Sequence, residues 1–135
     1  MRWQQVRWGR AVAGALIAEV AQIAAAFGWV AFYSYVIDPG QPVDVYEAHA
    51  RRSGPLVSIV AGFPIFYAAS RWIARSGPTA AALFGVFLLM DSALLLMMTG
   101  DDIPFGIVGV SFVTKLVACV LGGRHAAPRA GPVAA

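Results

Sequence analysis

The stretch that decides the fold occupies residues 11–37 and reads AVAGALIAEVAQIAAAFGWVAFYSYVI. Glu19 is its single acidic or basic side chain. A helix of these 27 residues extends about 40 Å, which exceeds the roughly 30 Å hydrocarbon core of a bilayer. We therefore predict a transmembrane helix whose carboxylate lies about 13 Å inside the boundary marked by Arg10.

The composition of the whole chain is that of a membrane protein. Of its 135 residues, 59% are hydrophobic and 13% are charged, whereas about a quarter of the residues of a soluble domain are charged. The net charge of +3 comes from arginines that flank apolar runs and from Lys115, which lies inside such a run. Because no continuous basic face results, the pattern argues against a nucleic-acid partner and indicates a lipid bilayer. The single cysteine, Cys119, excludes an internal disulfide and a cysteine metal cluster.

Three further apolar runs, at residues 53–72, 78–100 and 103–122, are long enough to cross a membrane. We therefore expect an all-α fold, an integral membrane antiparallel four-helix bundle of four transmembrane helices. The bundle occupies residues 11–122, between an interfacial cytoplasmic segment at residues 1–10 and a disordered cytoplasmic tail at residues 123–135. The tight connection at residues 76–78 predicts that the second and third spans are antiparallel neighbours.

The segment at residues 38–52 is predicted to be a periplasmic loop with a short helix of its own. Asp44 precedes Glu47 by three residues, a spacing typical of a helix N-terminus, so a helix is expected at residues 45–52. The Ser-Gly-Pro sequence at residues 53–55 is expected to break that helix and to start the second span, which Pro64 should kink.

The distribution of arginines predicts the orientation, because cytoplasmic loops carry an excess of basic residues. An even number of spans places both termini on one side, which we expect to be the cytoplasmic side. We expect the membrane to be a bacterial inner membrane, because the excess of Arg over Lys, with abundant Ala and Gly, is typical of a GC-rich bacterial genome. Seven arginines fall on that side, at positions Arg2, Arg7, Arg10, Arg71, Arg75, Arg124 and Arg129, whereas the other side carries Arg51 and Arg52 with Asp38, Asp44, Glu47, Asp101 and Asp102.

Four polar side chains inside the apolar runs form the candidate site: Glu19, Gln22, Asp91 and Lys115. Glu19 and Lys115 are each nine residues from an arginine at the cytoplasmic boundary, so both should lie about 13 Å deep. We therefore predict an ion pair or charge-assisted hydrogen bond between them that joins the first and fourth spans. Small residues on the same helix faces, Ala11, Ala15, Ala26, Ser111, Ala118 and Gly122, would allow close packing.

Asp91 of the third span has a different predicted depth in the membrane. It lies sixteen residues beyond Arg75, which predicts a position about 10 Å above the plane of Glu19 and Lys115. A solvent-facing position near the kinked second span stays open for its side chain, and so do three states of a buried one. It could be protonated, bonded to Ser92 or the backbone, or reached by the long stem of Lys115.

One local resemblance concerns Glu19. Residues 14–20, GALIAEV, are similar to the first-helix segment of small multidrug resistance transporters, four-span bacterial proteins of similar length that work as dimers. Those transporters exchange protons for cationic drugs at one first-helix glutamate, and the resemblance implies this role for Glu19. The tryptophan and glycine pattern of the family's third helix is absent from residues 83–98, and Asp91 and Lys115 are additional charges.

No catalytic motif accompanies these residues. The chain contains no Gly-x-Ser-x-Gly sequence and no glycine-rich phosphate loop. Asp44, Glu47 and His49 could be read as a metal site, but a helix cap accounts for the two acidic residues without a metal. We expect that the protein is not an enzyme and has no catalytic residue, cofactor or metal. The favoured function is that of a structural or accessory membrane protein with a buried polar pair. The alternative is a proton-coupled exporter of small cations that uses Glu19. A homodimer or a larger membrane complex stays open.

Overall fold

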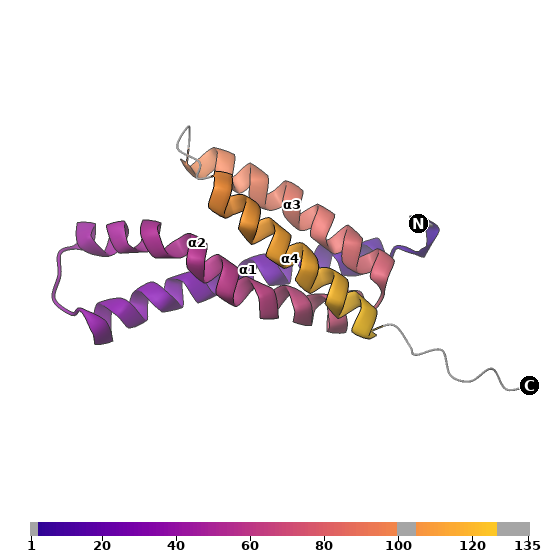
Figure 1. The fold of residues 1–135 in the computed structure, drawn as a ribbon, viewed down its shortest axis with the longest axis horizontal. Coiled ribbons are helices and arrows are strands. Elements are labelled where there is room, and N and C mark those ends of the chain that lie inside the picture. The colour runs from indigo at the N-terminus through magenta and orange to yellow at the C-terminus, as the bar shows by residue number, and fades with distance from the viewer. Residues whose placement is uncertain (1–2, 100–104, 127–135) are drawn as a thin grey trace, which may run out of the picture.

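The computed structural model describes residues 3–99 and 105–126, and every regular element in these ranges is helical. The all-α prediction is confirmed, and four of the helices are long and apolar enough to cross a membrane. A short 3₁₀ turn, η1, precedes them at Trp3–Gln5. The four helices are α1 (Trp8–Phe32), α2 (Val43–Ala68), α3 (Gly77–Thr99) and α4 (Phe105–Ala126), as Figure 1 shows.

The first two helices each end in a wider turn. Helix α1 continues as a π-helical segment, η2 (Tyr33–Ile37), and α2 continues as a second one, η3 (Ala69–Ala74). The amide of Arg75 closes η3 by donating to the carbonyl of Ser70 at 3.0 Å. Arg75 has a φ of 60°, a left-handed conformation that commonly ends a helix. With these extensions the first two candidate spans contain 30 and 32 residues.

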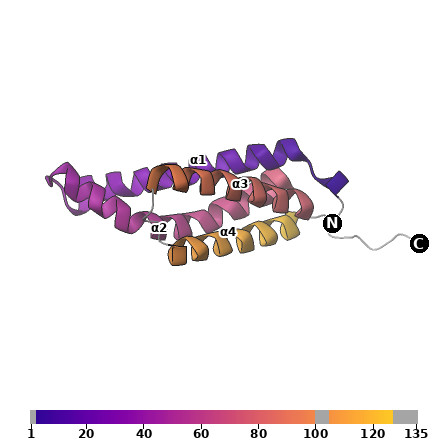
Figure 2. The ribbon, with the colours of Figure 1, turned by 90° about the horizontal axis from the view of Figure 1, so that it is seen from above.

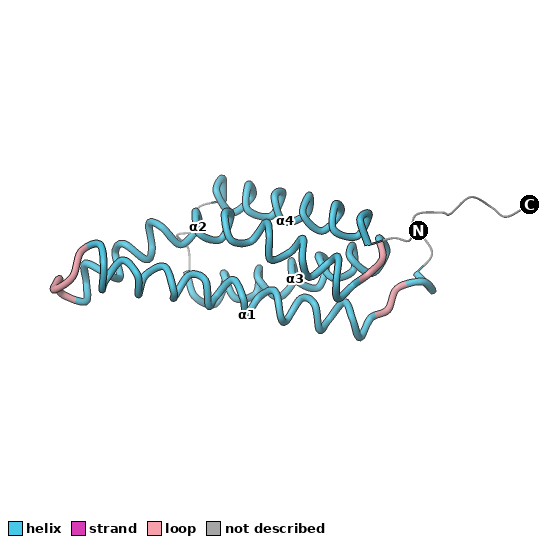
Figure 3. The backbone as a smooth tube through the Cα atoms, turned by 90° about the horizontal axis from the view of Figure 1, so that it is seen from below, coloured by secondary structure: helices cyan, strands magenta, loops and turns pink. Residues whose placement is uncertain are grey.

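The helices form a ring in which each one packs along two neighbours. Helix α1 packs on α2 and α3, and α4 packs on the same two helices, so α1 and α4 lie diagonally across the ring. Figures 2 and 3 show the four helices running side by side. Each hairpin is antiparallel, whereas α1 runs parallel to its neighbour α3 and α2 runs parallel to its neighbour α4. The prediction that the second and third spans are antiparallel neighbours is wrong for most of their length. They meet through η3 near their connection and through the rings of Phe66 and Phe87, whose centroids are 4.4 Å apart.

The two hairpins, α1–α2 and α3–α4, lie together at one end and diverge toward the other (Figure 1). The closed end holds the beginning of α1 and the end of α4. Its core is built from small residues with a few large ones, Leu83, Phe66 and Phe87, none of which has any exposed surface. The alanine and glycine faces expected from the sequence are confirmed, since Ala11, Ala15, Ser111, Ala118 and Gly122 are all buried and Ala26 is half-buried.

The predicted break at residues 53–55 does not occur, because α2 is one helix from Val43 to Ala68. Residues 43–52 are therefore part of α2, and only residues 38–42 form a loop. Pro42 is the N-cap residue of α2, so Asp44 lies inside the first turn and is not the predicted cap. Helix α2 bends part-way along (Figure 1), as expected for a helix that contains Pro55 and Pro64.

Contacts with the end of the first span explain why α2 continues through its proline. The indole N–H of Trp29 donates to Nε2 of His49 at 3.1 Å, and the His49 ring stacks on Tyr33 with centroids 3.6 Å apart. These contacts fix the first turns of α2 against α1. Tertiary contacts of this kind override the weaker local preference of a Ser-Gly-Pro sequence.

The C-terminal boundary also differs from the prediction. Helix α4 ends at Ala126, so residues 123–126 are helical and do not belong to a disordered tail. The remaining tail, at residues 127–135, lies outside the described residues, as do Arg2, Asp101 and Asp102.

A substitution at Gly122 tests whether α4 packs closely against the second span. A Cβ atom at this position would lie 2.5 Å from the backbone oxygen of Tyr67, which cannot move without disturbing its helix. We expect Gly122→Ala to lower the free energy of unfolding by about 1–3 kcal/mol, measured by thermal unfolding in detergent. Gly109→Ala on the same helix is the matched control, because nothing lies within 4 Å of its Cβ position. Equal melting temperatures for the two variants would contradict this packing.

Candidate functional site

Helices α1 and α3 run in the same direction and are aligned by one hydrogen bond at the closed end. The amide of Arg7 donates to Oγ1 of Thr79 at 3.2 Å. Glu19 lies twelve residues beyond Arg7, and Asp91 lies twelve residues beyond Thr79. At about 1.5 Å per residue both carboxylates are about 18 Å from this bond, so they lie at one level. The predicted 10 Å offset of Asp91 is wrong because Arg75 ends η3 and lies outside α3, which begins at Gly77.

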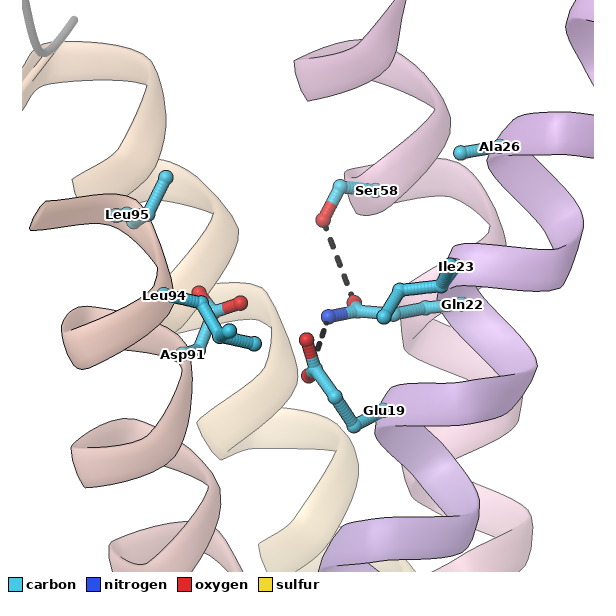
Figure 4. Close-up of a pocket in the computed structure, with 8 residues that line it drawn as sticks. All are labelled: Glu19, Gln22, Ile23, Ala26, Ser58, Asp91, Leu94 and Leu95. Atoms are coloured by element: carbon cyan, nitrogen blue, oxygen red, sulfur yellow. Dashed lines mark hydrogen bonds between the residues drawn. The ribbon is translucent and has the colours of Figure 1, made fainter. Parts of the chain in front are cut away.

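Glu19 is buried, with 6% of its surface exposed, and Gln22 lies one turn further along the same face of α1. The Gln22 amide Nε2 donates to Glu19 Oε2 at 2.7 Å. Figure 4 shows the two side chains leaving α1 together and pointing into the bundle. The amide therefore satisfies one oxygen of a carboxylate that has little access to water.

Lys115 of α4 is the most deeply buried charged side chain in the described residues, with 1% of its surface exposed. Its Nζ donates to Oγ of Ser58 at 2.7 Å. The same nitrogen lies 5.0 Å from the ring centroid of Phe87 and 5.6 Å from that of Phe66, within the range of cation–π attraction. The ammonium is therefore held by one hydroxyl and two aromatic rings.

Helix direction and a glycine explain how Lys115 reaches this position. Side chains on a helix lean toward its N-terminus, and the N-terminus of α4 lies at the diverging end, so the lysine stem extends toward Ser58. The stem passes over Gly62 of α2. A Cβ atom there would lie 2.7 Å from the Cε of Lys115, which shows how closely the stem approaches α2.

Ser58 connects the lysine to the glutamate. Its hydroxyl accepts from Lys115 and lies 3.4 Å from Oε1 of Gln22, to which it donates. The Gln22 amide then donates to Glu19, so every donor in this chain points from the ammonium toward the carboxylate. Ser111 of α4 adds a hydroxyl 3.4 Å from that of Ser58. We call the series Lys115–Ser58–Gln22–Glu19 the polar chain.

The predicted direct ion pair between Glu19 and Lys115 is not formed among residues 3–99 and 105–126. The reason is geometric, because α1 and α4 lie on a diagonal of the ring and the Ser58 side chain of α2 enters between them. The two residues are still at comparable depth and interact electrostatically. The sequence-based prediction put both residues on inward helix faces, which is correct, but it joined them by a direct ion pair, which is not formed.

A cavity of about 260 Å³ lies beside the polar chain and is lined by residues of α1, α2 and α3. Figure 4 shows the carboxylates of Glu19 and Asp91 facing one another across it, one from α1 and the other from α3. Asp91 is half-buried, its carboxyl group lies within hydrogen-bonding reach of that of Glu19, and it interacts electrostatically with Lys115. The rest of the wall includes the hydroxyl of Ser58, the amide of Gln22 and the apolar side chains Ile23, Ala26, Leu94 and Leu95.

The structure brings all four residues of the predicted site, Glu19, Gln22, Asp91 and Lys115, to one level of the bundle. The sequence analysis missed Ser58, Phe66 and Phe87 as partners of the lysine. A depth count from Arg71 places Ser58 at about 20 Å, about 7 Å beyond Glu19 and Lys115, so it finds Ser58 only if the length of the lysine stem is added. The phenylalanines carry no such signal, since many apolar residues share their depth.

The chain matches no protein-family model, no curated protein and no solved structure. Its function is therefore argued from the site itself.

The bond from Lys115 to Ser58 can be tested by a double-mutant cycle. Ser58→Ala leaves a buried ammonium without its acceptor, so we expect a loss of about 1.5–3 kcal/mol in unfolding free energy. In a Lys115→Met background the same change should cost much less, because no ammonium remains to be satisfied. The free energies are measured by unfolding in mixed detergent micelles.

Ser53→Ala is the matched control for this cycle. Its hydroxyl also lies on α2, but it donates to the carbonyl of His49 in its own helix at 2.8 Å. This change should cost little in either background. Equal losses for Ser58→Ala with and without Lys115 would contradict the bond.

Proposed function

We propose that the protein is an integral component of a bacterial inner membrane, with four spans and both termini in the cytoplasm. Four apolar helices of sufficient length support membrane insertion. The closed end of the bundle carries the basic side chains Arg7, Arg10, Arg71, Arg75 and Arg124, whereas the other end combines Arg51 and Arg52 with acidic residues. This difference supports the orientation through the positive-inside rule.

Within that framework, the cavity lined by Glu19 and Asp91 binds a small cation in exchange for a proton. The observation that carries this proposal is the pair of carboxylates facing one another across a cavity in an otherwise apolar bundle. Two carboxylates repel one another in surroundings of low dielectric constant, and a proton or a cation between them relieves the repulsion. Acidic side chains at this depth commonly mark ion or proton pathways.

The cavity wall favours an organic cation over a metal ion. Ca²⁺ takes six to eight oxygen ligands and Mg²⁺ keeps several bound waters, whereas half of the residues in this wall are apolar and the Gln22 carbonyl and the Ser58 hydroxyl are already engaged in the polar chain. The aliphatic side chains Ile23, Leu94 and Leu95 suit methyl or methylene groups. At about 260 Å³ the space suits a small quaternary ammonium ion. Glu19 then has the role that the resemblance of residues 14–20 implies.

A structural role is the second candidate, favoured by the polar chain itself. The chain joins α4, α2 and α1 through hydrogen bonds, and such bonds hold helices together inside a membrane. In this alternative the protein is an accessory component, and the cavity binds no cation. The two candidates differ in whether a cation displaces a proton.

Proton release distinguishes these two functions. We expect tetramethylammonium added to purified protein in weakly buffered detergent to release protons, within a pH range of about 6–9. Glu19→Gln should abolish the release, because it removes one of the two facing carboxylates. Glu47→Gln is the control, since Glu47 is exposed in the first turns of α2, and it should release as many protons as the unaltered protein. No release at any pH in this range would leave the structural role.

Cysteine labelling tests the proposed orientation. Gln41 lies in the loop between the first two spans and Gln5 lies in η1 at the other end, and both are exposed. We expect a membrane-impermeant maleimide to label Gln41→Cys in intact spheroplasts, and to label Gln5→Cys only after permeabilisation. The native Cys119 is buried, with 1% of its surface exposed, and should give little background. Labelling of Gln5→Cys in intact spheroplasts would contradict the orientation.

A further inference from the structure

Three ionisable side chains occupy the middle of the bundle, and their charges do not cancel. Of the other acidic and basic residues in the described ranges, those that lie furthest inside a helix are Arg51 and Arg52 of α2, which are exposed and precede Ser58 by seven and six residues, about 9–11 Å along the helix. With every group ionised, the centre carries two negative charges and one positive charge. Among the described residues at this level, one negative charge is left without a counterpart.

Lys115 is a fixed part of this arrangement. The Ser58 hydroxyl, the rings of Phe66 and Phe87, and Gly62 against its stem hold the ammonium in place, and 1% of the side chain is exposed. It interacts electrostatically with Glu19 and with Asp91. Because an uncompensated charge in such surroundings is costly, the ammonium of Lys115 balances one of the two negative charges of Glu19 and Asp91.

The position of the lysine relative to the cavity is equally important. Lys115 does not line the cavity, whereas Glu19, Gln22, Ser58 and Asp91 do. Its ammonium reaches the cavity wall at Ser58 and Gln22, through the polar chain. It can therefore neutralise charge at the site while leaving the cavity beside the two carboxyl groups open for a ligand.

From these observations, and resting on the proposed function, we infer that Lys115 is a built-in counter-cation that restricts the site to one positive charge. It supplies one of the two positive charges that balance Glu19 and Asp91, and the ligand supplies the other. The site therefore accepts a proton or an organic monocation and discriminates against dications. Lys115 is a specificity-determining residue that acts through charge without touching the ligand.

The number of protons released on saturation with a ligand tests this inference, because each bound positive charge replaces one proton. The unaltered protein should release about one proton per chain with tetramethylammonium. Asp91→Asn leaves one carboxylate opposite the lysine, a neutral centre, and should release none. The double variant Asp91→Asn with Lys115→Met has one carboxylate and no lysine, so release should return to about one proton per chain.

Lys115→Met alone tests the predicted change in ligand charge. Its centre holds two carboxylates without a lysine, so a bis-quaternary propane diammonium ion should bind it and release about two protons per chain. The unaltered protein should prefer tetramethylammonium over this dication. Arg124→Met is the matched control, since it removes an exposed basic residue from the same helix and should keep the unaltered stoichiometry and preference.

The outcomes separate this inference from the proposed function. If the unaltered protein releases no proton with tetramethylammonium, cation exchange itself is wrong. If it releases about one proton while the double variant releases none, or while Lys115→Met keeps the preference for the monocation, only the role of Lys115 is wrong. Should Lys115→Met fail to fold, the double variant compared with Asp91→Asn decides the question.

Discussion

The ammonium group of Lys115 lies in the middle of an apolar helix bundle, and the rest of the structure depends on how that charge is accommodated. Removing an ammonium from water costs several kcal/mol unless hydrogen bonds and opposite charges replace its hydration. Here the replacement comes from three other helices: Ser58 and Phe66 of α2, Phe87 of α3, and the more distant carboxylates of α1 and α3. The lysine therefore has partners on every other helix, and this gives the four helices a common centre.

The shape of the bundle follows from where close packing is possible. Toward the closed end, alanine and glycine faces allow the helices to approach, and Gly122 lies against the backbone of the second span. Away from the closed end the hairpins diverge (Figure 1), and the boundary between α1, α2 and α3 holds the cavity lined by Glu19 and Asp91. A cavity at that boundary combines access with low dielectric surroundings, the two conditions that make a buried carboxylate pair sensitive to a cation.

The sequence predicted what depends on composition and helix periodicity. Apolar run length predicted four helices, and the spacing of small residues placed Glu19, Gln22 and Lys115 on inward faces. It failed where tertiary contacts decide. The stacking of His49 on Tyr33 keeps α2 helical through Pro55, and the ring order of the helices places Ser58 between the two charged residues. Depth counted from a flanking arginine failed for Asp91, because an arginine outside a helix does not mark where that helix begins.

The environment of Lys115 is the central claim, and nitrogen NMR tests it most directly because the chain contains a single lysine. Protein with ¹⁵N at the lysine Nζ, in lipid bilayers at neutral pH, should give one ammonium resonance. Its protons should exchange slowly with water and show through-space contacts to the rings of Phe66 and Phe87. A resonance whose protons exchange as fast as those of free lysine, without contacts to either ring, would contradict the account.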